Sequence, residues 1–553
     1  MERLEGLVTS LAAGHITRRE FVWQATLLGL STASIGSLLA ACQAGGSQQA
    51  GGKPRLIVAV DTDIDDLDPN NFKSDAAYEA VIQTYEMPVD NRLKQGDNGV
   101  LEATPDLDPT LASSYQVSPD GLKYTFKVRP GVKFSNGSPV TAKSFDYGYK
   151  RALLGPGYAA LLMNMLTVKD PSQLRVVDDM TYEITLEKPN PMANKLFPLT
   201  VLDVMDPDTA QKNATPDDKY ATKFFKTNIV GTGPYVKGDV WQSGSQYLFN
   251  PNPSYWNKSK VKNSGVLMKY IPSAEDRLLL LRRGDIDLAF GLPAKSLNQL
   301  QSVKDVKLNR FASRNTNYMV LNSRQKPFDD VRVRQAIQYA IPYDTLVKNV
   351  LYGFGRPLKS IVAAGMPTSE DSTWSYANNM DKAKSLLAEA NLGSGFRTSL
   401  GVSVSRAEDA DAAVWIQSSL AKLGIQVDIN KLSDADFRAK QQADQLPMFI
   451  EYWYSWVNDP FYQLYWLMLS SNKFTNVARY SDPEMDNVIS TGMYNTNESQ
   501  RAQLSRRAQE IFDRDVPYIL LYQRDFVLAG RSNVQGINVY PDQYLRFWQL
   551  TKS

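Results

Sequence analysis

Apolar and polar positions alternate along several stretches of the chain and predict short strands. Residues 55–61 form an apolar run that ends in Asp61, a pattern typical of a buried strand. Within residues 115–134, Tyr124, Phe126 and Val128 alternate with lysine and threonine, and glycine-containing turns bracket the stretch. This alternation predicts a small antiparallel meander with one buried face.

Helical spacing joins the strand pattern in two further parts of the chain. Strand-like residues 266–271, a helix through residues 277–281 and a second strand at residues 284–290 predict a βαβ unit. Thr141 and Asp330 each precede apolar residues at helical spacing, so both are predicted N-caps. Strand 397–404, helix 409–423 and strand 425–429 then predict a second α/β unit, for which we expect a separate sheet.

Length and charge narrow the class of protein. The chain has 553 residues, which is too long for one core, and 43% of them are hydrophobic and 22% charged, as in ordinary globular proteins. Lysine and arginine total 61 against 59 acidic residues, a net charge of +2. Since no basic stripe or excess is present to neutralise phosphates, we expect no nucleic-acid partner.

Two residue types are nearly missing. The one histidine, His15, and the one cysteine, Cys42, both lie near the N-terminus. The remaining body therefore has no residues for Ser-His-Asp or Cys-His catalysis, for thiolate or imidazole zinc sites, or for disulfides. Carboxylate chemistry, or binding without chemistry, is what remains, and no cofactor is expected.

The N-terminal segment has the pattern of an export signal. An uncharged, mostly apolar stretch from Ala25 to Ala41 ends in Leu-Ala-Ala-Cys, so we expect a signal peptide at residues 1–41, acylation of Cys42 and a flexible tether at residues 42–53. Arg18 and Arg19 resemble a twin-arginine (Tat) signal, with Sec export as the alternative. An uncleaved membrane helix is the competing interpretation. Acylation predicts a protein held by lipid on the outer face of the cell membrane.

Several segments share their order and spacing with one known family. They are Leu-Asp-Pro at 67–69, residues 111–142 with Ser-Pro-Asp-Gly-Leu-Lys-Tyr-Thr-Phe, Val-Gly-Thr-Gly-Pro-Tyr at 230–235, Asn-Pro-Asn-Pro-Ser-Tyr-Trp at 250–256, Arg-Gly-Asp-Ile-Asp at 283–287, and Pro-Phe-Asp-Asp-Val-Arg-Val-Arg-Gln-Ala at 327–336. Together they resemble the dipeptide- and oligopeptide-binding proteins of ABC importers, solute-binding protein family 5.

The resemblance implies an α/β, two-lobed, periplasmic-binding-protein-like fold of class II with three domains, hinge strands and an inserted β meander. Lobe I would comprise residues 54–75, 230–315 and 486–553, with an inserted subdomain at 76–229, and lobe II would comprise residues 316–485. Such a receptor closes around its solute and delivers it to ABC permease subunits. We expect a monomer without catalytic residues.

The resemblance also places candidate solute contacts. Peptide-binding members usually have Trp-x-x-Asp-x-x-Asp-Pro, in which the first Asp faces the α-amino group of the ligand, whereas this chain has Trp456 at that position, after Trp453. Indole offers an ammonium only a cation–π face, so we expect that a free peptide N-terminus is not the main anchor. The alternative is that these aromatic residues pack the core of the lobe.

Three further contacts are candidates. Arg406 lies where a carboxylate-binding arginine can sit in dipeptide-binding relatives, with an exposed surface role as the alternative. Lys73 and Asp75 match a loop at the edge of the cleft, although a solvated role is favoured. The aspartates between Asp61 and Asp68 do not fit the EF-hand pattern, so we expect them to cap a turn and predict no metal site.

The sequence thus predicts a receptor that binds a peptide or a peptide-like solute. An oligosaccharide receptor of the same importer class is an alternative. A carboxylate-dependent glycoside hydrolase is the alternative of another class, because paired acidic residues are all that the missing histidine leaves for catalysis.

Overall fold

The computed structural model describes residues 53–96 and 100–553. The predicted signal peptide, Cys42 and the predicted tether up to residue 52 lie outside the described residues. Among the described helices, none combines the length and the apolar character that crossing a membrane requires.

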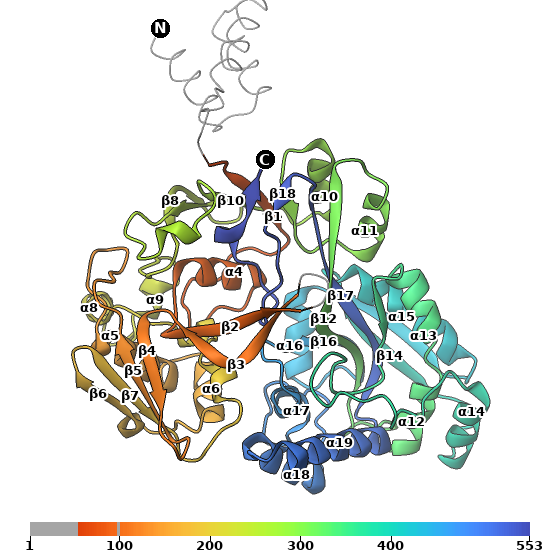
Figure 1. Ribbon diagram of the computed structural model, residues 1–553. Helices are drawn as coiled ribbons and strands as arrows, with labels where there is room; N and C mark the ends of the chain where they lie inside the picture. The colour runs from red at the N-terminus through yellow and green to blue at the C-terminus, as the bar shows by residue number, and fades with distance from the viewer. Residues whose placement is uncertain (1–52, 97–99) are drawn as a thin grey trace, which may run out of the picture. The chain divides into compact units, whose positions relative to one another are not determined.

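Two long antiparallel strands, β12 (Val306–Leu321) and β17 (Tyr518–Arg531), lie side by side in the middle of an 11-stranded sheet (Figure 1). The strand β16 (Met448–Tyr454) pairs with β12 on one side, and β11 (Leu288–Ala289) pairs with β17 on the other. The remaining strands continue outward from these two. They are β14 (Arg397–Ser403), β15 (Gln426–Leu432), β1 (Leu56–Val60), β10 (Val266–Tyr270), β9 (Gln246–Pro251), β8 (Tyr235–Gln242) and, off the main path, β13 (Gly355–Pro357).

The expectation of a separate sheet for the second α/β unit is wrong. Strands β14–β16 belong to the same sheet as β1, because β12 and β17 are long enough to pair with both groups. At about 3.3 Å per residue, the 16 residues of β12 span about 50 Å. Polar residues from Arg310 to Asn317 interrupt the apolar pattern of β12, so its length could not be read from hydrophobicity.

We call the part built on β1 and β8–β11 the first lobe, and the part built on β14–β16 the second lobe. The sheet thus carries two lobes joined by β12 and β17, which agrees with the expected two-lobed α/β fold. The exact limits of the predicted domains stay a prediction.

The predicted meander is a four-stranded antiparallel sheet. Tyr124, Phe126 and Val128 are buried on one face, as the alternation predicts. Helix α5 (Ala142–Leu154) follows Thr141 and packs on this face through Phe145 and its neighbours. The strands are β4 (Ala112–Val117), β5 (Lys123–Val128), β7 (Thr181–Thr185) and β6 (Leu174–Asp178), and a separate hairpin contains β2 (Val89–Gln95) and β3 (Leu101–Pro109).

Helices cover both lobes (Figure 1). Asp330 caps α12, since its side chain accepts from the Arg332 N–H at 2.9 Å, as predicted. With the meander and first lobe are α4 (Asp75–Thr84), α6 (Ala159–Met165), α7 (Ala193–Leu196), α8 (Pro207–Asn213), α9 (Thr222–Phe225), α10 (Ala274–Arg283) and α11 (Ala294–Leu300). With the second lobe are α12 (Val331–Tyr339), α13 (Tyr343–Thr345), α14 (Met380–Glu389), α15 (Ala407–Ala421), α16 (Asp434–Gln442), α17 (Pro460–Met468), α18 (Pro483–Tyr494) and α19 (Glu498–Asp515).

Two sequence motifs of the first lobe have structural roles. Asp68 of Leu-Asp-Pro forms a buried ion pair with Arg151 of α5, in which Oδ1 accepts from Nη1 at 2.7 Å. This pair connects the meander to the loop between β1 and α4. Gly231 of Gly-Thr-Gly-Pro-Tyr lies so close to the Thr84 carbonyl at the end of α4 that a Cβ atom would overlap it. The motif therefore reflects close backbone packing.

Candidate functional site

Side chains of the two lobes approach one another in one region, which we call the interlobe space. The first lobe contributes Asp75, at the first position of α4, and Tyr544 from the C-terminal segment. The second lobe contributes Tyr452 and Tyr454 of β16 and Trp456 just beyond it. The Tyr454 and Tyr544 rings lie 6.0 Å apart, so the two lobes approach closely here.

Asp75 indicates that water enters this space. Its side chain is exposed to solvent, yet burial raises its pKa to about 6, against the effect of a hydrogen bond that the Tyr544 hydroxyl donates to Oδ1 at 2.6 Å. Both properties hold together for a side chain that reaches solvent while many protein atoms surround it. Ser74 caps α4 by accepting from the Ala77 N–H, which fixes Asp75 in the first helical turn.

Aromatic rings form the walls around Asp75. Tyr78 stacks on Tyr544 with centroids 3.8 Å apart, and Trp456 lies 5.3 Å from Tyr78. Trp456 also contacts Phe72 and Tyr158, so this half-buried side chain reaches from the second lobe into the first. Its contacts cross between the lobes, where a solute would be held.

Arg406 lies at the edge of the same region but is already paired. Its guanidinium contacts Glu451 at 2.7 Å and Asp409 at 3.3 Å, and it lies 5.5 Å from the Tyr452 ring. Burial would lower the pKa of Arg406, but the charges of Glu451 and Asp409 raise it above its usual value. Burial raises the pKa of Asp409 to about 7, and the charge of Arg406 offsets only part of this effect. We take Glu451 as the main partner, because it is closer and its pKa is held below the usual value by Arg406 and Arg438 in spite of burial.

The other two candidates lie elsewhere. Trp453 contacts Trp466 at 5.7 Å and donates to Ser455 Oγ at 3.2 Å. As an alternate residue of β16, it faces away from Tyr452 and Tyr454. Lys73 is exposed on the loop before α4. The structure thus brings Trp456 and Asp75 together, with Arg406 near them, and leaves Trp453 and Lys73 apart.

The aspartates between Asp61 and Asp68 stabilise a turn. Asp65 accepts from the Ser74 N–H at 3.0 Å, and Asp66 accepts from the Asp68 N–H at 2.9 Å and from Asn71 at 2.8 Å. These bonds are the capping role that the sequence predicts. In residues 53–96 and 100–553, no three His, Cys, Asp or Glu side chains are grouped so that they could hold a metal ion.

A charged contact joins the lobes beside the interlobe space. Asp459, fully buried at the start of α17, accepts from Lys195 of α7 at 2.8 Å and from Arg501 of α19 at 2.6 Å. Burial alone would raise the pKa of Asp459, but these two cations hold it below its usual value. Lys195 belongs to the meander side and Asp459 to the second lobe, so this ion pair stabilises the approach of the lobes.

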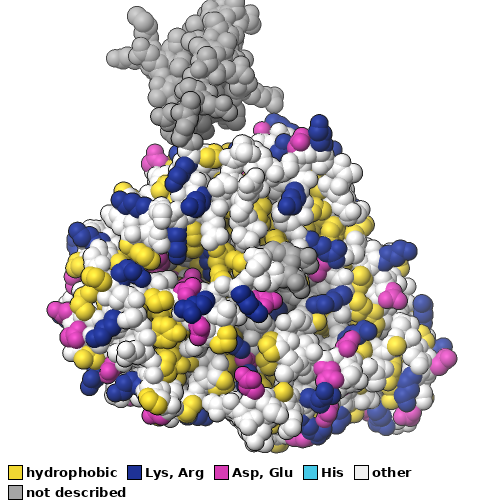
Figure 2. All heavy atoms as spheres, viewed as in Figure 1, with side chains coloured by type: hydrophobic (Ala, Val, Ile, Leu, Met, Phe, Trp, Pro, Cys, Tyr) yellow, Lys and Arg dark blue, Asp and Glu magenta, His cyan; other side chains and the backbone are white. Residues whose placement is uncertain are grey.

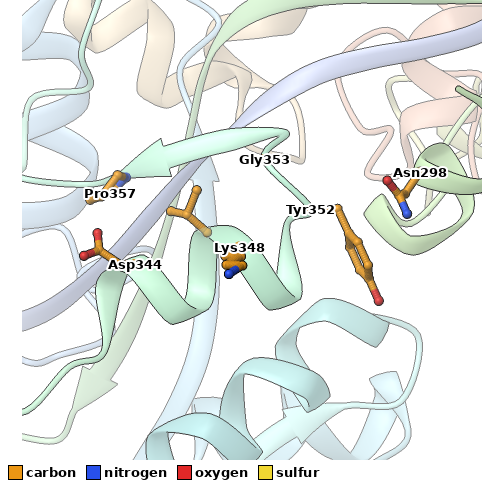
Figure 3. Close-up of a pocket in the computed structure, with 7 residues that line it drawn as sticks. Asn298, Asp344, Lys348, Tyr352, Gly353 and Pro357 are labelled. Carbon is orange, nitrogen blue, oxygen red and sulfur yellow. The ribbon is translucent and has the colours of Figure 1, made fainter.

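A surface groove of about 580 Å³ lies between α11 and the segment after α13 (Figure 3). Its lining includes Asn298, Asp344, Lys348 and Tyr352, all of them exposed. In Figure 3 the side chains of Asp344, Tyr352 and Asn298 lie apart and do not converge on one point. An enclosed solute site needs convergent polar groups and shelter from water, so the interlobe space fits this role better than the groove does.

Comparison with known sequences decides the family. The sequence profile described as "Bacterial extracellular solute-binding proteins, family 5 Middle" matches residues 106–475. The chain belongs to this family. Family 5 members are extracellular solute-binding proteins, so this chain is a binding receptor and not an enzyme, and the glycoside hydrolase alternative is excluded.

Relatives agree over most of the chain. The probable D,D-dipeptide-binding periplasmic protein DdpA of Escherichia coli is 29% identical, over 88% of this chain and 92% of its own. The glutathione-binding protein GsiB of Shigella flexneri is 28% identical, over 94% and 96%. The structure of the periplasmic binding protein DppA of Helicobacter pylori with a bound peptide is 25% identical, with a TM-score of 0.79 over 90% of this chain and 98% of that one. These matches confirm the two-lobed fold of the family 5 proteins.

Sequence reasoning missed several residues of the interlobe space. Tyr544 follows no recognisable motif and reaches Asp75 only because the C-terminal segment packs along α4, where Gln83 donates to the Leu545 carbonyl at 3.0 Å. Tyr452 and Tyr454 are not among the predicted solute contacts. Their alternation with Glu451 and Trp453 was the available signal that they share a face.

Proposed function

We propose that this family 5 protein is the lipid-anchored receptor of an ABC importer, that it binds a peptide or peptide-like solute in the interlobe space, and that it presents the closed form to the permease. The main observation is that the exposed Asp75 carboxylate and the rings of Tyr454, Tyr544 and Trp456 come together where the two lobes approach each other. The names of the relatives support peptides as the class of solute.

A binding experiment tests the proposal. Purified protein is titrated calorimetrically with a library of dipeptides and tripeptides, and peptides are assayed afterwards for cleavage. We expect saturable binding with one site and no hydrolysis. The aromatic walls also suit stacking against sugar rings, so cello- and malto-oligosaccharides form the second arm. Saturable binding of sugars but of no peptide would replace the peptide proposal with the oligosaccharide alternative.

Trp456 offers a sharper test within the same assay. We expect Trp456→Ala to weaken solute binding by about tenfold, because an aromatic wall at the centre of an interface carries much of the binding energy. Its thermal midpoint should stay close to that of the parent, because the side chain is only half-buried. A large loss of stability with unchanged binding would assign Trp456 to the core. Trp415→Ala, on the exposed face of α15, is the control.

The lipid anchor is a separate part of the proposal. It depends on the Leu-Ala-Ala-Cys sequence that ends at Cys42. Cys42→Ser should release the protein from the membrane fraction of cells that express it, whereas retention would favour an uncleaved membrane helix. A double variant, Arg18→Lys with Arg19→Lys, distinguishes the two export routes. Its export should be lost if the protein uses the Tat route and kept if it uses the Sec route.

A further inference from the structure

Two arginines beside the interlobe space, Arg406 and Arg524, are neutralised by carboxylates. Arg406 pairs with Glu451 and Asp409, as described above. Arg524 of β17 pairs with Glu408 at 3.3 Å, and Glu408 also accepts from the Ala294 N–H at the start of α11. A carboxylate on the solute would have to compete with these buried partners.

Asp75 has the opposite environment. Within residues 53–96 and 100–553, no lysine or arginine forms an ion pair with its carboxylate, and the hydrogen bond that it accepts comes from the neutral hydroxyl of Tyr544. Asp61, a charge that acts on its pKa, is also negative and raises it. A carboxylate enclosed by protein without a cation is unfavourable, so this position favours a positive charge brought by the solute.

Two asparagines of β12, the long strand that joins the lobes, have side-chain oxygens without a hydrogen-bond partner among the described residues. Asn315 pairs with Tyr454 on one side and with Arg524 on the other, and Asn317 pairs with Tyr452 in the same way. Directly paired residues of neighbouring strands point to the same face, so both amides share the face of β16 that carries the two tyrosines. Asn317 is 3% exposed, and the Oδ1 atoms of both asparagines are buried without a hydrogen-bond partner among the described residues.

Ring contacts connect this face to Asp75, because the Tyr454 ring lies 6.0 Å from the ring of Tyr544, whose hydroxyl donates to Asp75. The charge of Asp75 contributes to the raised pKa of both Tyr452 and Tyr454, for which burial is the largest cause. The carboxylate, the two amide oxygens and the aromatic rings thus belong to one site. Buried acceptors without partners are costly unless a ligand donates to them.

We propose that the solute is cationic, with a protonated amine that pairs with Asp75, further N–H groups that donate to Asn315 and Asn317, and an apolar part against Tyr454 and Trp456. This inference rests on the proposed receptor function and specifies its class of solute. Rings beside the carboxylate add cation–π attraction to the same ammonium group.

The proposal also revises the expectation drawn from Trp456. The motif places Trp456 where relatives are expected to have an ammonium-binding aspartate, which suggested that an amine has no charge partner in this chain. Asp75 supplies that partner from the first lobe, on the far side of the Tyr78 and Tyr544 rings. An amine can therefore be bound, but by the lobe opposite to the one that the motif indicates.

Matched peptides of opposite charge test the inference. Ala-Ala-Phe-amide carries a free amine and no carboxylate, whereas N-acetyl-Ala-Ala-Phe carries a carboxylate and no amine. We expect the amide to bind at least about tenfold more tightly to the parent protein, since hydrogen bonds to charged groups contribute most in enclosed sites. Asp75→Asn should abolish this preference, and Asp276→Asn, an exposed carboxylate in the first turn of α10, should keep it.

The results distinguish a failure of the cationic-solute proposal from a failure of the peptide-receptor proposal. Equal binding of both peptides, unaffected by Asp75→Asn, would overturn the cationic class and leave the peptide receptor. Tighter binding of the acetylated peptide would overturn it in favour of Arg406. If neither peptide binds, 1,5-diaminopentane is the second probe: binding to the parent but not to Asp75→Asn supports the cationic site and rejects peptides, and no binding rejects both. Thermal unfolding of Asp75→Asn confirms that the variant is folded.

Discussion

Asp75 offers a test of the interlobe space that needs no knowledge of the solute. Burial raises its pKa from 3.8 to about 6, so its ionisation opposes folding of the unliganded protein above that pH. The change corresponds to about 3 kcal/mol at neutral pH. Because solvent reaches the side chain and screens its charge, we reduce this to about 1.5 kcal/mol. Loss of a favourable first-turn carboxylate costs about 0.5 kcal/mol. We therefore expect Asp75→Asn to stabilise the protein by about 1 kcal/mol at pH 8.

The pH dependence gives the sign of the effect. A carboxyl group whose folded pKa is raised binds more protons in the folded state between about pH 4 and pH 6, so its unfavourable contribution is absent below this window and complete above it. Urea unfolding of Asp75→Asn and of the parent should give equal midpoints near pH 4 and a higher midpoint for the variant at pH 8. Asp276→Asn controls for the helix-terminus effect and should be slightly destabilised. A variant less stable than the parent at pH 8, or a difference independent of pH, would refute the argument.

Three further predictions concern the lobes and their packing. Arg151→Met should destabilise the protein by about 3–5 kcal/mol in urea unfolding, because it leaves the buried Asp68 carboxylate unpaired; Lys169→Met, which breaks the exposed pair with Glu187, should change stability by less than about 1 kcal/mol. Lys195→Met should increase the radius of gyration in small-angle X-ray scattering and weaken solute binding by about fivefold, and unchanged scattering would show that the ion pair does not hold the lobes together. Gly231→Ala should lower the thermal midpoint, because a methyl group overlaps the Thr84 carbonyl, whereas the same change at Gly393, where a Cβ has ordinary contacts, should have little effect.

Local patterns of the sequence predicted the elements well but not their long-range pairing. The meander strand with Tyr124, the cap at Asp330 and the α/β units are all present, because each depends on neighbours within one or two turns of chain. The single sheet was missed, since it depends on the pairing of β12 with β17 across some 200 residues of sequence, as at Asn317 and Tyr522. The polar centre of β12 has no apolar periodicity, and that centre is what crosses between the lobes.

Long-range contacts also limit what the sequence can predict about the candidate site. Motif position made Trp456 and the loop of Asp75 candidates, but it could not show that Arg406 is neutralised, because Glu451 lies 45 residues further along the chain. Nor could it show that Asn315 and Asn317 lack partners, since satisfaction of a buried amide depends on every element packed around it. Residue types at motif positions indicate where a solute is held. Its charge depends on which of the polar groups are left unpaired after folding.

That distinction bears on how solute specificity changes in a two-lobed receptor. Closure brings together groups from opposite lobes, so a charge needed by the solute can be supplied from either side of the space. Here Asp75 lies on the first lobe and Trp456 on the second, and the rings of Tyr78 and Tyr544 connect them. A substitution at one wall therefore leaves the recognised charge unchanged when the other wall carries it. If Asp75 binds the amine as proposed, the first lobe alone should hold the solute before the lobes close.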